Sequence, residues 1–337
     1  MRVATLDHQE LDRPQGGETP GLHPVTEALL TIVDDDPLPA GHTSSHWQQY
    51  GQATVVARQG TDVQLRASGF EPVQHLPRHA RFLSAVERFS YRAAIAQLRS
   101  YRSIWALAHD LAEDLAASAS FNVFKSVCVL ATLADHWAAH RLSPTRFALI
   151  GDGYGFLGAL IRRLRPDARL YCIDLPKILV FQAHIHARAD RRVRMTLLSR
   201  RAVLDDGADV TLVPPQHMED VPGPIDCAIT VDSMQEMSPW SISGYFAFLR
   251  RRSTSSSRFY CLNRLHKELP GGEIADFHAY PWREADEIFL DGVCPFHTHF
   301  LAPYTLPIGP RVWQVRVPFV NQFDGTHMHR LVRLAPP

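Results

Sequence analysis

Short uncharged apolar runs alternate with helical spacing through the second half of the chain. Runs such as Phe147–Ile150 and Cys227–Val231 contain no charged residue, as is typical of strands buried on both faces of a sheet. Apolar residues three and four apart predict helices over 156–164, 177–187 and 242–249. This alternation indicates a mostly parallel sheet in an α/β protein. The predicted strands are Phe147–Ile150, Leu170–Ile173, Val193–Leu198, Val210–Val213, Cys227–Val231 and Arg258–Leu262, with Val312–Val317 and His327–Leu334 as an antiparallel edge.

The first 143 residues show a different pattern. Scattered Pro, Gly and Asp residues and weak periodicity over residues 1–45 predict a loosely ordered lead-in with little chemistry. Helical spacing follows from about Leu76 to His140, as in Ile104, Leu107 and Leu111. We therefore predict three parts, which are the lead-in at 1–45, a helical cap over the substrate at 46–143, and the α/β domain at 144–337.

The composition limits the kinds of molecule that the protein is expected to bind. The chain has 35 Lys plus Arg and 35 Asp plus Glu, so it offers no bulk positive field to attract nucleic acid or anionic lipid. Its 5 cysteines never occur as Cys-x-x-Cys, which argues against a disulfide framework or a zinc cage. No uncharged apolar stretch reaches the length of a membrane span. We expect a cytoplasmic protein with a small-molecule substrate, and assembly into a homo-oligomer is left open.

A glycine-rich turn follows the first predicted strand of the sheet. Gly151, Gly153 and Gly155 stand where the chain must bend into a helix and where its backbone can approach a ligand without intervening side chains. A dinucleotide-binding loop would need a glycine at the position of Phe156. The spacing suits instead the methionine and ribose parts of S-adenosylmethionine, which has no pyrophosphate.

An acid at the end of the next strand completes this signal. Asp174 follows the turn by about 20 residues, where a carboxylate can accept hydrogen bonds from both ribose hydroxyls. The neighbouring Leu175 is assigned to the same cofactor site. The loop after a later strand offers His217 and Met218 to the adenine ring. The sequence therefore predicts an S-adenosylmethionine site.

Two further strands end in polar residues on the same rim, where ligands bind in open α/β sheets. Asp232 follows one of these strands, and we assign it both to cofactor binding and to catalysis. Side chains that can orient a polyhydroxylated or phosphate-bearing acceptor come from both strands; they are Ser233, Gln235, Asn263 and Arg264.

At this point the chain resembles the sugar O-methyltransferases among the class I S-adenosylmethionine-dependent methyltransferases. The resemblance runs from about Phe147 to Phe300. It implies a Rossmann-like, seven-stranded methyltransferase sheet with an N-terminal helical cap. Related proteins often have a glutamate where this chain has Leu149, and Asp152 would then take over its hydrogen bonding to the cofactor. The motifs are Ile150–Gly155, Ile173–Pro176, Ser233–Met237, Tyr260–Arg264, Leu269–Gly272, Tyr280–Trp282 and Cys294–His297.

Methyl transfer to a hydroxyl requires alignment of three atoms and removal of a proton. The candidate bases are His297, Glu236, Asp232 and His266, of which we favour His297 or Glu236. Each also has a structural explanation as a cap, turn or packed residue. Asp232, Glu236 and Asp276 could hold Mg²⁺, but no spacing compels it, and the pairs at His297/His299 and His327/His329 are discounted as zinc ligands. We predict no metal.

The sequence thus favours an S-adenosylmethionine-dependent O-methyltransferase that acts on a sugar or glycosylated small molecule, in specialised metabolism such as antibiotic biosynthesis or in glycan tailoring. Two alternatives remain. One is an NAD-dependent oxidoreductase, which Phe156 disfavours. The other is a catalytically degenerate methyltransferase-like binding subunit, which Leu149 keeps open.

Overall fold

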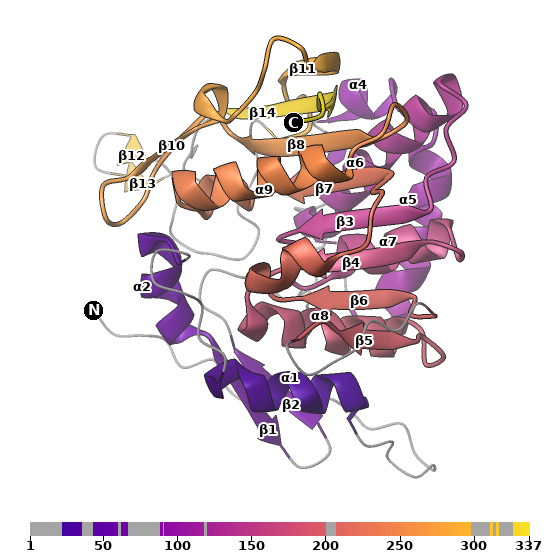
Figure 1. Ribbon diagram of the computed structural model, residues 1–337. Helices are drawn as coiled ribbons and strands as arrows, with labels where there is room; N and C mark the ends of the chain where they lie inside the picture. Colours follow the sequence, from indigo (N-terminus) through magenta and orange to yellow (C-terminus); the bar gives the residue numbers. More distant parts are fainter. Residues whose placement is uncertain are drawn as a thin grey trace.

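The computed structural model describes residues 22–35, 43–59, 62–66, 88–89, 91–117, 120–199, 207–297, 311–312, 315–316 and 326–337. An eight-stranded sheet runs through its centre in the order β11-β14-β8-β7-β3-β4-β6-β5 (Figure 1). The strands from β8 to β5 are parallel, and β14 runs antiparallel between β8 and β11. The bounds are β3 (Arg146–Ile150), β4 (Arg169–Ile173), β5 (Met195–Leu197), β6 (Val210–Val213), β7 (Cys227–Val231), β8 (Arg258–Arg264), β11 (Glu287–Val293) and β14 (His327–Arg333).

This topology confirms the predicted Rossmann-like fold class, with eight strands where we expected seven. The prediction that Val312–Val317 forms an edge of the sheet is wrong. Its described residues belong to β12 (Arg311–Val312) and β13 (Val315–Arg316), which pair with each other as a separate hairpin, while residues 313, 314 and 317 lie outside the described ones. The edge position is taken by β11, whose side chains are all at least partly exposed. An edge strand of this kind lacks the apolar run by which buried strands are found.

Helices cover both faces of the sheet, so its strands are buried on both sides. Alternate side chains of β3 point to opposite faces, with Phe147 in one apolar cluster and Ala148 in the other. The first cluster is completed by α5 (Tyr101–Asp114), α6 (Phe121–Ala139), α7 (Phe156–Leu164) and α8 (Pro176–Ala189). The second is completed by α9 (Pro239–Arg252), which crosses the front of the sheet in Figure 1.

Helices α5 and α6, which lie within the predicted cap, contribute buried residues to the first of these clusters. Trp137 of α6 packs edge-on against Phe147 of β3, with ring centroids 5.7 Å apart. A short helix, α4 (Arg92–Ile95), precedes them, and the part of the predicted cap that spans residues 76–87 lies outside the described ones. The domain boundary at residue 144 stays a prediction. In the described parts of the chain, no helix has the length and apolar character needed to cross a membrane.

The described part of the predicted lead-in contains a helix. Within residues 1–45, Pro24–Asp35 forms helix α1, which packs against α8 and buries Leu29 completely. Helix α2 (Ser45–Ala53) and the hairpin of β1 (Val55–Gln59) and β2 (Asp62–Arg66) follow. The apolar spacing of Val25, Leu29 and Ile32 suits a helix, but flanking Pro and Asp residues obscured it.

Several short elements connect the strands at the carboxyl rim of the sheet. The turns η1 (Pro215–Asp220) and η2 (Met234–Glu236) follow β6 and β7. The hairpin of β9 (His266–Glu268) and β10 (Ile274–Asp276) follows β8, and η3 (Phe277–Ala279) comes after it. These connections form the rim on which ligands bind in open parallel sheets.

Candidate functional site

A cavity of about 440 Å³ lies at the carboxyl ends of β3, β4 and β7. Its wall includes the glycine turn, the acid that follows β4, and the polar residues that follow β7. It also includes residues from two distant segments, the start of α2 and the start of α6. The cavity therefore joins the predicted cofactor and acceptor regions in one space.

The glycine turn adopts a backbone conformation that favours glycine. Gly151, Gly153 and Gly155 adopt φ angles of +72°, +57° and +84°, a left-handed region that favours glycine. A Cβ on Gly151 would lie 1.8 Å from Oγ of Ser233, so the two loops touch directly. Gly151, Gly153 and Ser233 line the cavity.

Gly155 has a structural role instead. It is the N-cap residue of α7, and a Cβ placed on it would lie 3.0 Å from Cα of Gln182 in α8. Gly155 does not line the cavity. The third glycine thus allows α7 and α8 to approach each other below the turn.

Asp174 lies in the wall of the cavity, one strand from the glycine turn. Its Oδ1 accepts a hydrogen bond from the Leu175 backbone (2.8 Å), and its Oδ2 accepts one from Nε2 of Gln182 (2.8 Å). Burial raises the pKa of Asp174 to about 8, although the Leu175 N–H opposes this shift. Leu175 also lines the cavity.

Asp152 is turned toward the first turn of α7. Its Oδ2 accepts a hydrogen bond from the backbone of Gly158 (2.8 Å), an arrangement that satisfies an unpaired helix N–H. Burial raises the pKa of Asp152 to about 7, and the Gly158 N–H opposes the shift. Asp152 lines the cavity and supports α7, which is a role the sequence did not suggest.

The two predicted adenine contacts differ in position. Met218 of η1 lines the cavity, beside Pro215 and close to Gly244 of α9. His217 is buried and does not line it, and its Nδ1 lies 3.6 Å from Oδ2 of Asp220. Of these two adjacent residues, Met218 alone faces the cavity.

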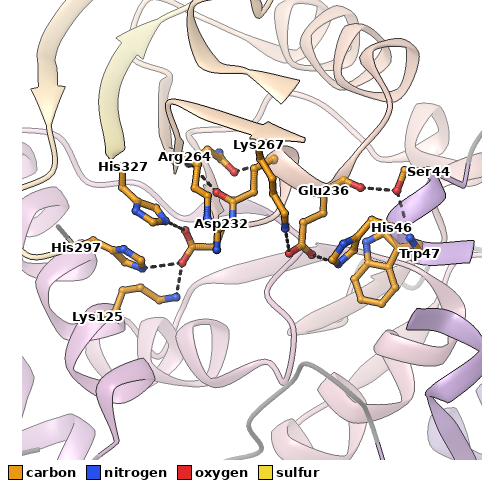
Figure 2. Close-up of polar contacts among 12 residues, drawn as sticks. Ser44, His46, Trp47, Lys125, Asp232, Glu236, Arg264, Lys267, His297 and His327 are labelled. Atoms are coloured by element: carbon orange, nitrogen blue, oxygen red, sulfur yellow. Dashed lines mark hydrogen bonds and ion pairs between the residues drawn. The ribbon is translucent and has the colours of Figure 1, made fainter. Parts of the chain in front are cut away.

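Asp232 is the centre of one polar cluster (Figure 2). It has φ +55°, and it lines the cavity directly after β7. Its Oδ2 lies 2.5 Å from Nζ of Lys125 and 3.0 Å from Nε2 of His297, while its Oδ1 lies 3.4 Å from Nε2 of His327. Burial alone would raise the pKa of Asp232, but His297 and Lys125 hold it well below its usual value. Asp232 is therefore ionised.

Glu236 is the centre of a second polar cluster in the same cavity (Figure 2). Its Oε1 lies 2.7 Å from Nζ of Lys267, and its Oε2 lies 3.3 Å from Nε2 of His46. Burial favours a higher pKa for Glu236, but hydrogen bonds from His46 and Lys267 lower it. The Ser44 hydroxyl donates to the Glu236 backbone carbonyl and fixes the start of α2 on this loop.

His46 and Lys125 are two cavity residues that the sequence reasoning missed. His46 lies in α2, next to a segment from which little chemistry was expected, and Lys125 lies on a helix that reads as apolar. No local motif marks either residue. The fold brings both to the end of β7 from distant parts of the chain, which a single sequence does not reveal.

Four predicted site residues lie elsewhere. The side chain of His266 is 60% exposed, with Nδ1 3.5 Å from Oδ2 of Asp276. The buried side chains of Gln235 and Asn263 hold η2 on β8, because Oδ1 of Asn263 accepts from the Gln235 backbone (3.0 Å) and Oε1 of Gln235 accepts from the Arg264 backbone (2.6 Å). None of these four, His266, Gln235, Asn263 and Arg264, lines the cavity.

His297 is close to the cavity but lies behind Asp232. Its ring is buried, contacts Asp232 and does not form part of the cavity wall. Burial lowers the pKa of His297, although Asp232 opposes this shift. His297 can influence a bound molecule through Asp232, whereas its companion residue in our prediction, His299, lies outside the described residues.

The cavity also has an aromatic part. Trp47 of α2 and Trp240 at the start of α9 both line it, and Trp240 is 59% exposed. Indole faces and ionised carboxylates in one cavity suit a ligand that has both apolar and hydroxylated surfaces.

Comparisons with known proteins found solved structures with low similarity to this chain. A scan against models of known protein families and a search of curated proteins both found no match. Among solved structures, the N-methyltransferase NodS from Bradyrhizobium japonicum is 10% identical, with 60% of this chain and 93% of that chain covered and a TM-score of 0.35. An S-adenosylmethionine-dependent methyltransferase from Clostridium acetobutylicum is 11% identical, with 60% and 89% covered and a TM-score of 0.34.

CalS10, an amino pentose methyltransferase from Micromonospora echinaspora, is 15% identical, with a TM-score of 0.27. The match covers 39% of this chain and 47% of that chain, so it spans less than half of CalS10. None of these likenesses carries the argument for function, which rests on the cavity itself.

Proposed function

We propose that this protein is an S-adenosylmethionine-dependent O-methyltransferase that acts on a hydroxyl of a sugar or glycosylated small molecule. The observation that carries the proposal is the single cavity, which joins the glycine turn and Asp174 to the two polar clusters at the end of β7. A methyl donor at one end and a hydroxyl at the other would lie within the same cavity. Holding both reactants in line supplies much of the rate enhancement for such a transfer.

The cofactor is assigned to the glycine end of the cavity. The backbone of Gly151 and Gly153 would lie against its methionine part, and Asp174, positioned by Gln182, would accept hydrogen bonds from the ribose hydroxyls. Leu175 and Met218 would flank the adenine. Phe156 lines the cavity where a dinucleotide-binding turn has glycine, which disfavours the NAD alternative.

The acceptor is assigned to the end that contains Asp232 and Glu236. We assign proton removal to His46, with Glu236 as the carboxylate that orients the imidazole and stabilises its protonated form. Asp232, held ionised by Lys125, would accept a hydrogen bond from a second hydroxyl of the acceptor.

The sugar part of the proposal is supported by Trp47 and Trp240. Indole rings pack against the apolar face of a pyranose while the polar clusters accept its hydroxyl groups. The same combination fits the resemblance to sugar O-methyltransferases noted in the sequence.

Isothermal titration with S-adenosylmethionine tests the cofactor site. Asp174→Ala should weaken binding by on the order of 100-fold, because charge-assisted hydrogen bonds contribute about 1.5–3 kcal/mol each. Asp167→Ala, which removes an exposed acid between α7 and β4, is the matched control and should bind as the parent chain does. Equal affinity for the parent chain and Asp174→Ala would remove the basis of the proposal.

The acceptor can then be found with cofactor that carries a labelled methyl group. Cell extract is incubated with the protein and labelled S-adenosylmethionine, and products are identified by mass spectrometry. A labelled product that is absent with Asp174→Ala is expected to carry the methyl on a sugar oxygen, and label on nitrogen or carbon would contradict the proposed acceptor.

A further inference from the structure

Three side chains with metal-binding atoms converge beside the acceptor end of the cavity. Asp232 follows β7, His297 follows β11, and His327 begins β14. Their ligand atoms all lie within 4.8 Å of one another, and the two imidazole rings have centroids 3.8 Å apart. The histidines are buried, and Figure 2 shows both rings turned toward the same carboxylate.

The arrangement is a set of two imidazoles and one carboxylate. Zinc and other divalent transition ions take this ligand set, whereas Mg²⁺ and Ca²⁺ take oxygen ligands almost exclusively. Each imidazole presents Nε2 to Asp232, at 3.0 and 3.4 Å. The three ligands come from different elements, so the fold itself holds their positions.

The backbone at Asp232 adds an independent observation. Asp232 has φ +55°, a left-handed conformation that is unfavourable for most L-residues and that clusters at ligand sites. This conformation lets the carboxylate face both the cavity and the two histidines.

Lys125 supplies the positive charge that the cluster has in this structure. Its Nζ lies 2.5 Å from Oδ2 of Asp232, and Lys125 lines the cavity. An ion that enters from the cavity would meet Lys125 first, and the flexible lysine stem can move the ammonium aside. Lys125 would therefore compete with a metal for the same carboxylate.

From these contacts, the geometry points to a divalent transition-metal site formed by Asp232, His297 and His327, a ligand set that zinc accepts. The site opens on the cavity side of Asp232, so a bound ion would have a coordination position available to an acceptor oxygen. Such an ion lowers the pKa of a coordinated hydroxyl. This inference replaces our sequence-based prediction of no metal. Metal binding itself does not depend on methyl transfer, whereas the role toward an acceptor oxygen rests on the proposed function.

Titration of untagged, chelator-treated protein with Zn²⁺ by calorimetry tests the site directly, and Co²⁺ absorption reports its coordination. One tight equivalent is expected, with Co²⁺ bands of low coordination number. His327→Ala should weaken binding by on the order of 100-fold. Lys125→Met should tighten it by about tenfold, since a competing charge next to the ion is removed.

His109→Ala is the matched control, because His109, Asp110 and Glu113 form an exposed cluster that could also hold an ion. Its affinity should equal that of the parent chain. Thermal melting of Lys125→Met shows whether this variant still folds. The variant keeps all three proposed metal ligands. The inference would be overturned if Lys125→Met melts cooperatively but shows no Co²⁺ absorption bands. It would also be overturned if His109→Ala is the one variant that loses metal binding.

Discussion

Asp174 combines two properties that oppose each other in the ligand-free protein. Its carboxyl group is buried, so its pKa of about 8 favours the protonated form at neutral pH. Two ribose hydroxyls, however, are best held by the ionised form, which accepts hydrogen bonds with both oxygens. Cofactor affinity should therefore rise as the pH increases from about 6 to 9.

The same shift has a consequence for stability. The pKa of Asp174 in the folded protein lies above its value of about 3.9 in the unfolded chain. The contribution of Asp174 to the free energy of unfolding is therefore fully present below a pH of about 3.9 and is lost as the pH rises toward 8. Asp174→Asn, which is neutral at all pH values, should melt at a higher temperature than the parent chain at pH 8 and bind cofactor poorly. Calorimetry from pH 6 to 9 checks both effects, and a pH-independent parent affinity would contradict the first.

His46 and Glu236 should act as a pair in proton removal. His46→Ala should lower the rate of methyl incorporation into the acceptor by about 10²–10⁴-fold and leave S-adenosylmethionine affinity unchanged. Glu236→Gln should lower the rate as well, and the double variant should lose little more than His46→Ala, because groups that act together are not additive. Initial rates with labelled cofactor measure these effects.

His266→Ala provides the control for this pair. The sequence suggested His266 as a base, but its exposed side chain lies outside the cavity wall. This variant should retain the full rate. A loss of rate in His266→Ala equal to that in His46→Ala would show that the base has been assigned to the wrong histidine.

At the scale of the elements, Gly155 links the cofactor turn to helix packing. It starts α7 with φ +84°, and a Cβ there would press on Gln182, the residue that holds Asp174. Gly155→Ala should therefore lower the free energy of unfolding by about 1–2 kcal/mol for the left-handed backbone and weaken cofactor binding in addition. Urea denaturation and calorimetric titration separate the two effects.

Gly272 offers a matched comparison for that variant. It has φ +85°, but a Cβ placed on it meets no heavy atom within 4 Å. Gly272→Ala should show the backbone cost of about 1–2 kcal/mol and normal cofactor affinity. If both variants bind cofactor equally well, the contact with Gln182 does not position Asp174.

The strands that could be predicted from the sequence are the buried ones, because burial determines their pattern of apolar residues. β3, β4 and β7 are covered on both faces, which requires continuous apolar runs and leaves Gly151, Asp174 and Asp232 at their ends. The exposed edge strand β11 carries no such requirement, so it was missed. Gln235 and Asn263 bind neighbouring backbone in this structure. Polar residues after a strand can serve a ligand or the backbone, and spacing does not distinguish the two.

The position of the cavity wall depends on contacts between distant parts of the chain. Oγ of Ser45 in α2 donates to Glu273 (2.6 Å) and accepts from the Gly271 backbone (2.9 Å), while Nζ of Lys177 in α8 donates to the Gly51 carbonyl (3.2 Å). These bonds hold α2, with His46, against the sheet domain. No periodicity in the sequence predicts such tethers, since each depends on the completed fold.

For the whole molecule, the Arg250–Asp286 pair connects α9 to the carboxyl end of the chain. Both side chains are only 2% exposed, and Nη1 of Arg250 donates to Asp286 (2.6 Å) and to the Ala335 carbonyl (2.9 Å). Asp286→Ala leaves the guanidinium buried without its counter-charge, which should lower the free energy of unfolding by about 3–5 kcal/mol. The exposed pair of Arg251 and Glu219 lies one position further along α9, and Glu219→Ala should cost about 1 kcal/mol or less. Urea denaturation of both variants measures this difference in the free energy of unfolding. Equal midpoints for the two variants would mean that burial does not determine how much the Arg250–Asp286 pair stabilises the fold.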